Sequence, residues 1–358
     1  MPYIPQEILD IIIGYATADV NGRYLFSAFI SHTFHQIVLP YQFKSLTFAN
    51  KMTRDTIYRT TDIMVIPHFC EAINAGDAHA LSLAPLVQEL SLRAWSGRHG
   101  YANHCAIQGP SEKIMNSVIS FRNLTKLNIE NCYTSPAVME QLGKLVQLQS
   151  LHTLRCRDED YEYWDKKVTY GALSNLQSLH TLECEENFFH SERHFACIPM
   201  KKLRILKSGD VEVTKAFLKT DPPVQLKELH LNHSYGDLYS SASFPWNYLA
   251  SASSLTHLSL PNLQLPANDT SLVPPLQELQ YLHVHVGFAP RFADQPMKRM
   301  KISTDRRRGE AMGEVRQHWP GTVFPHVEYL ETDRSRNELD TISIEFWREF
   351  LPNIKEVR

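Results

Sequence analysis

Four histidines in the second half of the chain have a spacing that could bring them together. His230, His257, His283 and His285 each stand beside an apolar residue in segments of similar pattern. Imidazole is a common ligand of Zn²⁺ and a common acid–base group. A solvated polar patch with weak pH sensitivity fits the same pattern. No cysteine or carboxylate joins them at ligand spacing, so we expect the polar patch and no bound metal.

Other catalytic signatures are missing from the sequence. It contains no glycine-rich phosphate loop, no His-Glu-x-x-His helix and no paired Cys-x-x-Cys pattern. No Ser, Cys or Asp stands in a recognisable nucleophile context. We therefore predict a protein with no catalytic residues and no cofactor. A hydrolase in the histidine-rich region is the weaker alternative.

The segments that carry the histidines belong to an internal repeat. Residues 148–156 return as residues 176–184 with one substitution. This offset lies within the roughly 20–29 residue period of leucine-rich repeats. The frame apolar-x-x-apolar-x-apolar recurs along the chain. Its first positions are Phe43, Val87, Leu124, Leu151, Leu179, Leu203, Leu226, Leu255, Leu279, Met297, Val327 and Ile354.

Each unit of this repeat predicts a short strand followed by a helix or a turn. Alternate strand residues enter a shared core, which places Cys156 and Cys184 inward. Helices are expected after Ser111, Ser135 and Ser343, where a cap residue precedes apolar residues at helical spacing. Because packed helices need more room than paired strands, stacked units curve with the strands inside. We predict an α/β leucine-rich-repeat solenoid shaped as a horseshoe.

Composition narrows the possible partners and compartments. The formal charge of −3 and the sequence pI near 6.6 create no basic field, which argues against nucleic acid. The first twenty residues include Glu7 and Asp10 and lack a basic leader, so we expect neither a signal peptide nor a membrane span. Six cysteines are too few for a disulfide scaffold. Reduced thiols in the cytoplasm or nucleus are expected.

Residues 1–48 depart from the repeat and predict three short helices. Pro5 and Glu7 suit a first helical turn, and Ile8 and Ile12 then lie on one face. A bundle this small cannot cover all of its apolar side chains. Two interpretations stay open, since these helices either dock on a partner or cap the open end of the solenoid.

The N-terminal segment resembles the F-box. The resemblance is carried by Pro-x-Glu-Ile-Leu at the start and by a polar and aromatic stretch that runs into the first repeat strand. An F-box followed by irregular leucine-rich repeats is similar to the substrate-receptor subunits of SCF-type (Skp, cullin, F-box) ubiquitin ligases. The resemblance implies an F-box domain over 1–48, an irregular repeat domain over 49–358, and a Skp-type adaptor with its cullin complex as partners. It assigns adaptor contacts to Ile4, Pro5, Ile8, Leu9, Ile12, Ile13, Phe26, Phe29 and Ile30.

The inner face of the solenoid predicts a surface that binds a client protein. Polar residues of adjacent strands form rows around a few aromatic side chains, as protein-binding surfaces do. Two charged segments, acidic and aromatic near Trp164 and basic near Arg306 and Arg307, suit either recognition loops or ordinary solvated loops. The arginines also fit a weak nuclear-import patch. The candidate client contacts are Arg155, Glu183, His230, His257, Tyr281, His283, Trp164, Arg306 and Arg307.

Overall fold

The computed structural model is described here for fifteen segments of the chain. These are residues 39–41, 43–49, 67–93, 112–130, 132–134, 136–154, 156–158, 172–184, 202–209, 217, 224–232, 246–261, 273–303, 311–332 and 343–358.

Within the described segments, twelve parallel strands form the main sheet, and they pair in the order in which they follow one another along the chain. They are β1 (Ser45–Ala49), β2 (Glu89–Arg93), β3 (Lys126–Glu130), β5 (Ser150–Leu154), β7 (Thr181–Cys184), β8 (Ile205–Ser208), β9 (Glu228–Leu231), β10 (His257–Leu260), β11 (Tyr281–His285), β12 (Arg299–Ser303), β13 (Tyr329–Thr332) and β14 (Glu356–Val357). A second parallel sheet joins β4 (Tyr133–Thr134) and β6 (Arg157–Asp158).

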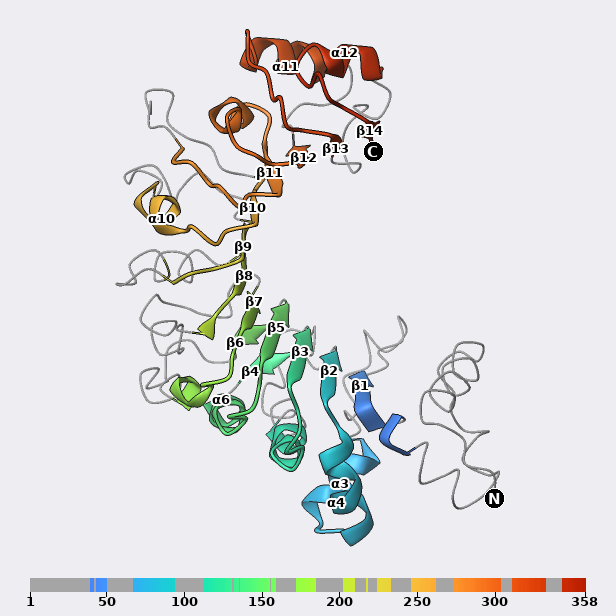
Figure 1. Ribbon diagram of the computed structural model, residues 1–358. Helices are drawn as coiled ribbons and strands as arrows, with labels where there is room; N and C mark the ends of the chain where they lie inside the picture. Colours follow the sequence, from blue (N-terminus) through green and yellow to red (C-terminus); the bar gives the residue numbers. More distant parts are fainter. Residues whose placement is uncertain are drawn as a thin grey trace, which may run out of the picture.

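Helices and short 3₁₀ turns connect the strands on the other side of the core. They are α3 (His68–Asn74), α4 (Ala78–Leu83), η3 (Ala84–Leu86), a helix over 112–118, α6 (Pro136–Gly143), η4 (Ala172–Asn175), α10 (Trp246–Ser251), η7 (Ala289–Phe292), α11 (Ala311–His318) and α12 (Ile344–Arg348). The strands line the inside of an arc, and the helices lie outside it (Figure 1). The predicted horseshoe is confirmed, and its curvature follows from the unequal widths of strands and helices.

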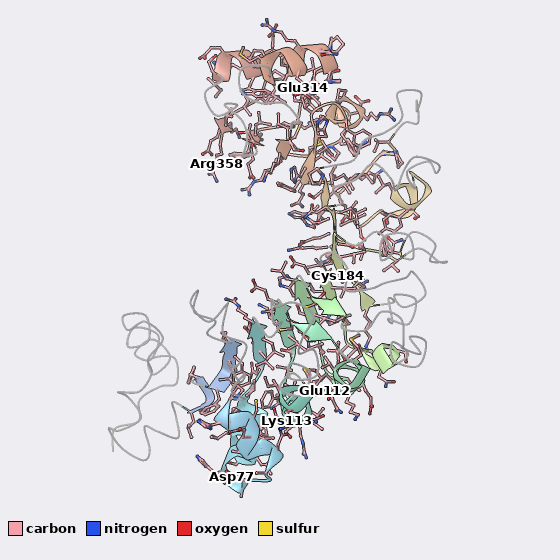
Figure 2. All side chains as sticks on the ribbon, turned by 180° about the vertical axis from the view of Figure 1, so that it is seen from behind. Asp77, Glu112, Lys113, Cys184, Glu314 and Arg358 are labelled. Carbon is pink, nitrogen blue, oxygen red and sulfur yellow. The ribbon has the colours of Figure 1, made fainter. Side chains whose placement is uncertain are left out.

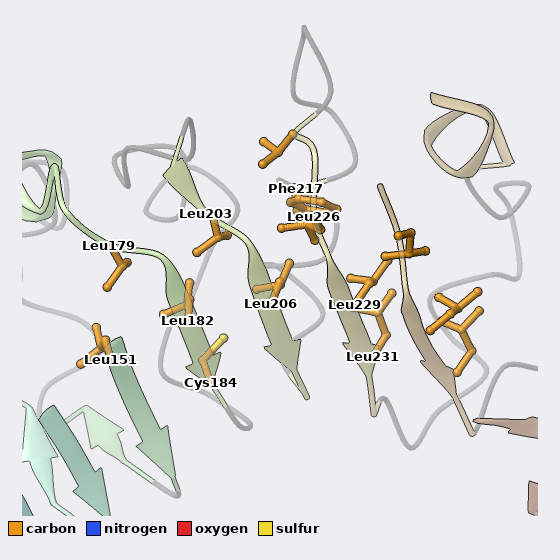
Figure 3. Close-up of a cluster of buried hydrophobic side chains, with 14 of the residues drawn as sticks. Leu151, Leu179, Leu182, Cys184, Leu203, Leu206, Phe217, Leu226, Leu229 and Leu231 are labelled. Carbon is orange, nitrogen blue, oxygen red and sulfur yellow. The ribbon is translucent and has the colours of Figure 1, made fainter. Parts of the chain in front are cut away.

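The core is a ladder of leucines between the sheet and the outer layer. Leu182, Leu206 and Leu229 occupy the same position in β7, β8 and β9, and each is at most 1% exposed. Figure 3 shows these side chains stacked from strand to strand. Burying one leucine side chain completely contributes about 1.5–3 kcal/mol to the free energy of folding. Because each unit contacts only its neighbours, this contribution repeats along the arc.

Side-chain caps begin two of the outer helices, and the cap at Ser343 was expected. Ser343 precedes α12, and its Oγ accepts a hydrogen bond from the backbone N–H of Phe346 at 3.4 Å. Asp77 caps α4 in the same way, with Oδ1 accepting from the N–H of Ala80 at 2.7 Å. The helices expected after Ser111 and Ser135 are also present. The short interval between Leu279 and Met297 contains the 3₁₀ turn η7 in place of an α-helix.

The first repeat strand is confirmed, whereas the predicted F-box helices lie almost entirely outside the described residues. β1 contains Leu46 and Phe48, which pack against the core, and it pairs with β2. The predicted domain boundary after residue 48 falls inside β1. Of the predicted F-box region, only residues 39–41 and 43–48 are described.

The predicted repeat frame at residues 148–156 was wrong by three residues. Leu151 pairs with Leu127 of β3 and Leu182 of β7, so it is the second apolar position of its unit. Thr153 takes the third position and is fully buried. The two near-identical nonapeptides are therefore out of structural register. A segment with leucine at every third residue fits the frame in two ways, which is why the pattern misled.

Two cysteines show why this frame is adopted. Cys132 Sγ donates to the carbonyl of Leu92 at 3.6 Å, and Cys156 Sγ donates to the carbonyl of Ile129 at 3.3 Å. Leu92 and Ile129 are register partners, so the two thiols occupy equivalent turn positions. Cys156 is buried as a turn residue, and its predicted place on the strand was wrong. The inward position of Cys184 is confirmed.

Candidate binding surface on the concave sheet

Two rows of side chains point away from the core toward the inside of the arc. The first row comes from the first residue of each strand, and the central row comes from the third. From β2 to β14 the first row is Glu89, Lys126, Ser150, Thr181, Ile205, Glu228, His257, Tyr281, Arg299, Tyr329 and Glu356. From β2 to β13 the central row is Ser91, Asn128, His152, Glu183, Lys207, His230, Ser259, His283, Lys301 and Glu331.

Five of the predicted client contacts lie in these rows. They are Glu183, His230, His257, Tyr281 and His283. The central position predicted for Arg155 belongs instead to His152, because of the three-residue shift in β5. Arg155, Trp164, Arg306 and Arg307 themselves lie outside the described residues. The 24-residue spacing of Cys132 and Cys156 was the sequence signal that pointed to His152.

Polar contacts join neighbouring strands in the central row. Asn128 Nδ2 donates to Ser91 Oγ at 3.1 Å. Glu183 stands between two bases, with its carboxylate 3.8 Å from His152 Nε2 and 3.6 Å from Lys207 Nζ. These side chains keep about a third of their surface exposed. An ion pair as open as the one between Glu183 and Lys207 contributes about 0–1 kcal/mol, so it leaves both charges available to a partner.

The predicted histidine patch forms on three adjacent strands. His257 of β10 shares a hydrogen bond of 2.9 Å between its Nδ1 and Thr256 Oγ1. Its ring stacks on the ring of Tyr281, with 5.7 Å between the ring centres. His283 of β11 shares a 3.0 Å hydrogen bond with Ser259 Oγ. Strands about 4.8 Å apart bring these rings into one polar and aromatic platform.

His230 lies in the same platform beside opposite charges. Its Nε2 is 3.6 Å from Glu228 Oε2. Burial lowers the pKa of His230, and the charge of Lys207 lowers it further, while Glu228 partly opposes them. A lowered pKa keeps the imidazole neutral, which favours hydrogen bonding and stacking over charge.

The stability of the protein should fall as the pH drops below about 6.5, the pKa of histidine in an unfolded chain. Because the folded-state pKa of His230 is lower, the unfolded chain takes up the proton first. The contribution of neutral His230 to folding stability is therefore fully present above pH 6.5. It is lost as the pH falls toward the folded-state pKa of His230.

Urea unfolding at several pH values measures this loss. A His230→Gln variant should show a flatter pH dependence below pH 6.5 than the unsubstituted chain. Lys207→Gln should flatten it in part, because one cause of the lowered pKa is removed. An unchanged slope in His230→Gln would contradict the assignment.

His285 does not join the other three histidines. Its Nδ1 accepts a hydrogen bond from the N–H of Gly287 at 3.2 Å, and its Nε2 faces Glu314 Oε1 of α11 at 3.9 Å. Glu314 is 5% exposed. Figure 2 places it on α11 at one end of the arc, and Asp77 lies at the other. The predicted grouping of four histidines is thus reduced to three.

The described residues hold no group of three or more His, Cys, Asp or Glu side chains arranged for a metal ion. A shallow polar hollow of about 420 Å³ lies at the turns before β2, β3, β5 and β7, and the sequence had not suggested it. Its lining is Gln88, Arg122, Asn123, Thr125, Gln147, Gln149 and Ser178.

Within the described parts of the chain, no helix is long and apolar enough to cross a membrane.

The parallel sheet, the leucine ladder and the outer helices define a solenoid of the leucine-rich-repeat type. No family model matches the chain, and no curated protein does.

Three solved structures are similar to it. Human 5T4 (trophoblast glycoprotein) is 14% identical over 86% of this chain and 84% of that chain, with a TM-score of 0.34. An internalin from Listeria monocytogenes is 13% identical over 80% of this chain and 93% of that chain, with a TM-score of 0.32. TLR13 in a complex with ssRNA13 is 15% identical over 77% of this chain and 44% of that chain, with a TM-score of 0.34.

Proposed function

We propose that this protein is a non-catalytic scaffold whose concave sheet binds another protein. The observation that carries the proposal is the pair of rows on the inner face, where polar, ionic and aromatic side chains stand in register across the strands. Such a surface offers dispersed hydrogen bonds around aromatic anchors. The curved sheet of a solenoid suits a folded partner or an extended segment.

We further propose that the scaffold is the substrate-recognition subunit of an SCF-type ubiquitin ligase. Support comes from the F-box-like sequence that precedes the repeats, with Ile4, Pro5, Ile8 and Leu9 at its start. In this role the chain performs no chemistry. It holds a client lysine near a charged ubiquitin-conjugating enzyme, which raises the effective concentration of the reacting groups.

The second candidate is a free-standing scaffold or sensor whose leading helices only cap the solenoid. An open solenoid end exposes core positions, and Leu46 and Phe48 of β1 are only partly buried against the described core. In a capping role, the N-terminal helices would cover these positions. Binding to a Skp-type adaptor separates the two candidates.

Co-expression of the full chain with a Skp-type adaptor tests the ligase proposal. We expect the two proteins to co-purify. The double substitution Ile8→Asp with Ile12→Asp should abolish the complex, because it puts two charges on the apolar face of the helix that the sequence predicts there, and burying them in an interface costs free energy. Size-exclusion chromatography and circular dichroism of the variant check that the repeats stay folded.

A matched control places the same charges on the outside of the solenoid. Ile119 and Val146 are 43% and 54% exposed. Ile119→Asp with Val146→Asp should leave adaptor binding unchanged. Failure of the unsubstituted chain to bind the adaptor, or equal loss in both double variants, would overturn the ligase proposal in favour of the free-standing scaffold.

A further inference from the structure

Charges are unevenly distributed along the two rows of the concave face. From β8 to β12 the rows contain the cations Lys207, Arg299 and Lys301, and the one carboxylate among them is Glu228. The rows of β13 and β14 contribute Glu331 and Glu356. A basic patch thus lies on a chain whose formal net charge is −3. We call the first- and central-row side chains of β8 to β12 the basic patch.

The carboxylate of Glu183, next to the basic patch, holds Lys207 only weakly. Lys207 is 3.6 Å from Glu183 of β7, and its side chain is 38% exposed. Glu228 faces His230 at 3.6 Å, within the patch. An exposed ion pair contributes about 0–1 kcal/mol, so an anion from a partner can take over Lys207 at small cost.

Between the lysines the patch offers half-buried aromatic and imidazole rings, whereas Ser259 is only 3% exposed. Ser259 and His283 are already joined at 3.0 Å, and His257 stacks on Tyr281. Arg299 lies over the ring of Tyr329, with 5.5 Å from its guanidinium carbon to the ring centre. Aromatic side chains with polar tips are typical anchors of protein-binding surfaces.

We propose that the basic patch binds an acidic segment of a partner protein in extended conformation. This inference rests on the proposed function of the concave face as a partner-binding surface. Lys207 and Lys301 are four strand steps apart, which is about 19 Å at 4.8 Å per step. An extended chain of about six residues covers that distance at roughly 3.3 Å per residue.

The bordering carboxylates favour a short acidic peptide over a nucleic acid. A nucleic-acid strand carries a phosphate at every nucleotide, so its backbone would run past the patch. It would then meet Glu183 on one side, and Glu331 and Glu356 on the other. A peptide can place its carboxylates over the cations and uncharged residues beside the glutamates.

Fluorescence anisotropy of the full-length chain tests the proposal. The probe is a fluorescein-labelled peptide of one tyrosine followed by six glutamates. We expect binding that weakens between about 50 mM and 300 mM salt, because exposed charges are screened. Lys207→Gln with Lys301→Gln should weaken binding about tenfold, since two charge-assisted contacts are lost.

Arg93→Gln with Lys126→Gln is the matched control, because it removes two cations of the same concave face on β2 and β3. Its affinity should stay within about twofold of the unsubstituted chain. Equal loss in both double variants, no binding of the probe, or tighter binding of a single-stranded oligonucleotide of equal charge would overturn the proposal. The Lys207 and Lys301 variant should still co-purify with the Skp-type adaptor if the ligase proposal holds, so the two proposals fail separately.

Discussion

Replacing Trp319 by alanine should destabilise the protein by about 3–5 kcal/mol. Trp319 follows α11 and is fully buried. Its ring packs 4.9 Å from Phe324, 5.6 Å from Phe350 and 6.1 Å from Trp347, measured between ring centres. Its Nε1 donates to the carbonyl of Val286 at 2.8 Å. The substitution therefore leaves both a cavity and an unsatisfied buried carbonyl.

The damage should be local, because a solenoid unit contacts only its neighbours. Hydrogen exchange should show loss of protection in β12, β13 and β14, while β2 to β5 keep most of theirs. Trp319→Phe separates the two causes, since it keeps much of the ring volume and removes the hydrogen bond. We expect it to cost about 1–3 kcal/mol. An even loss of protection along the whole sheet would contradict this local view of the core.

Thr153→Asp should destabilise the protein far more than Leu154→Asp. Thr153 is fully buried, and its Oγ1 has no hydrogen-bond partner among the described residues. A carboxylate there would be an unpaired buried charge, costing about 3–5 kcal/mol. Leu154 ends β5 half-buried beside Glu130. A charge at Leu154 stays in contact with water and should cost about 1 kcal/mol.

Urea unfolding of the two variants measures the difference. The order would reverse if the strand used the frame of Leu151, Leu154 and Cys156 that the sequence suggested. Thr153→Val adds an independent check, because it replaces an unsatisfied hydroxyl by a methyl group of similar size. We expect it to leave stability unchanged or to raise it by up to about 1 kcal/mol.

Most strands were predictable because their apolar positions repeat with little choice of frame. Leu127 and Ile129 of β3, and Leu258 and Leu260 of β10, occupy the inward positions that the pattern indicates. β5 was not predictable in this way, since its leucines at every third residue allow two frames. The decision came from contacts distant in sequence, between Cys156 and Ile129 and between Leu151 and its partners on both sides.

Residues of the candidate site were predictable wherever the repeat frame of their strand was predictable. His230, His257, Tyr281 and His283 followed from alternation along a strand and lie on the concave face as expected. His285 satisfies the same alternation, yet it contacts Gly287 and Glu314. No pattern within β11 indicates that α11, which follows β12, brings a carboxylate to this histidine.

The sequence by itself determined that the chain is a solenoid of stacked strands, because a periodic apolar frame can be buried only by neighbouring copies of itself. Tertiary structure alone decided which side chains meet across the strands. Register depends on contacts between units, and a shift of three residues in one strand exchanges His152 for Arg155 on the concave face. The same stacking places Lys207 and Lys301 on either side of the three histidines. The two lysines are far apart in the sequence, so only the stacked units bring them to one surface.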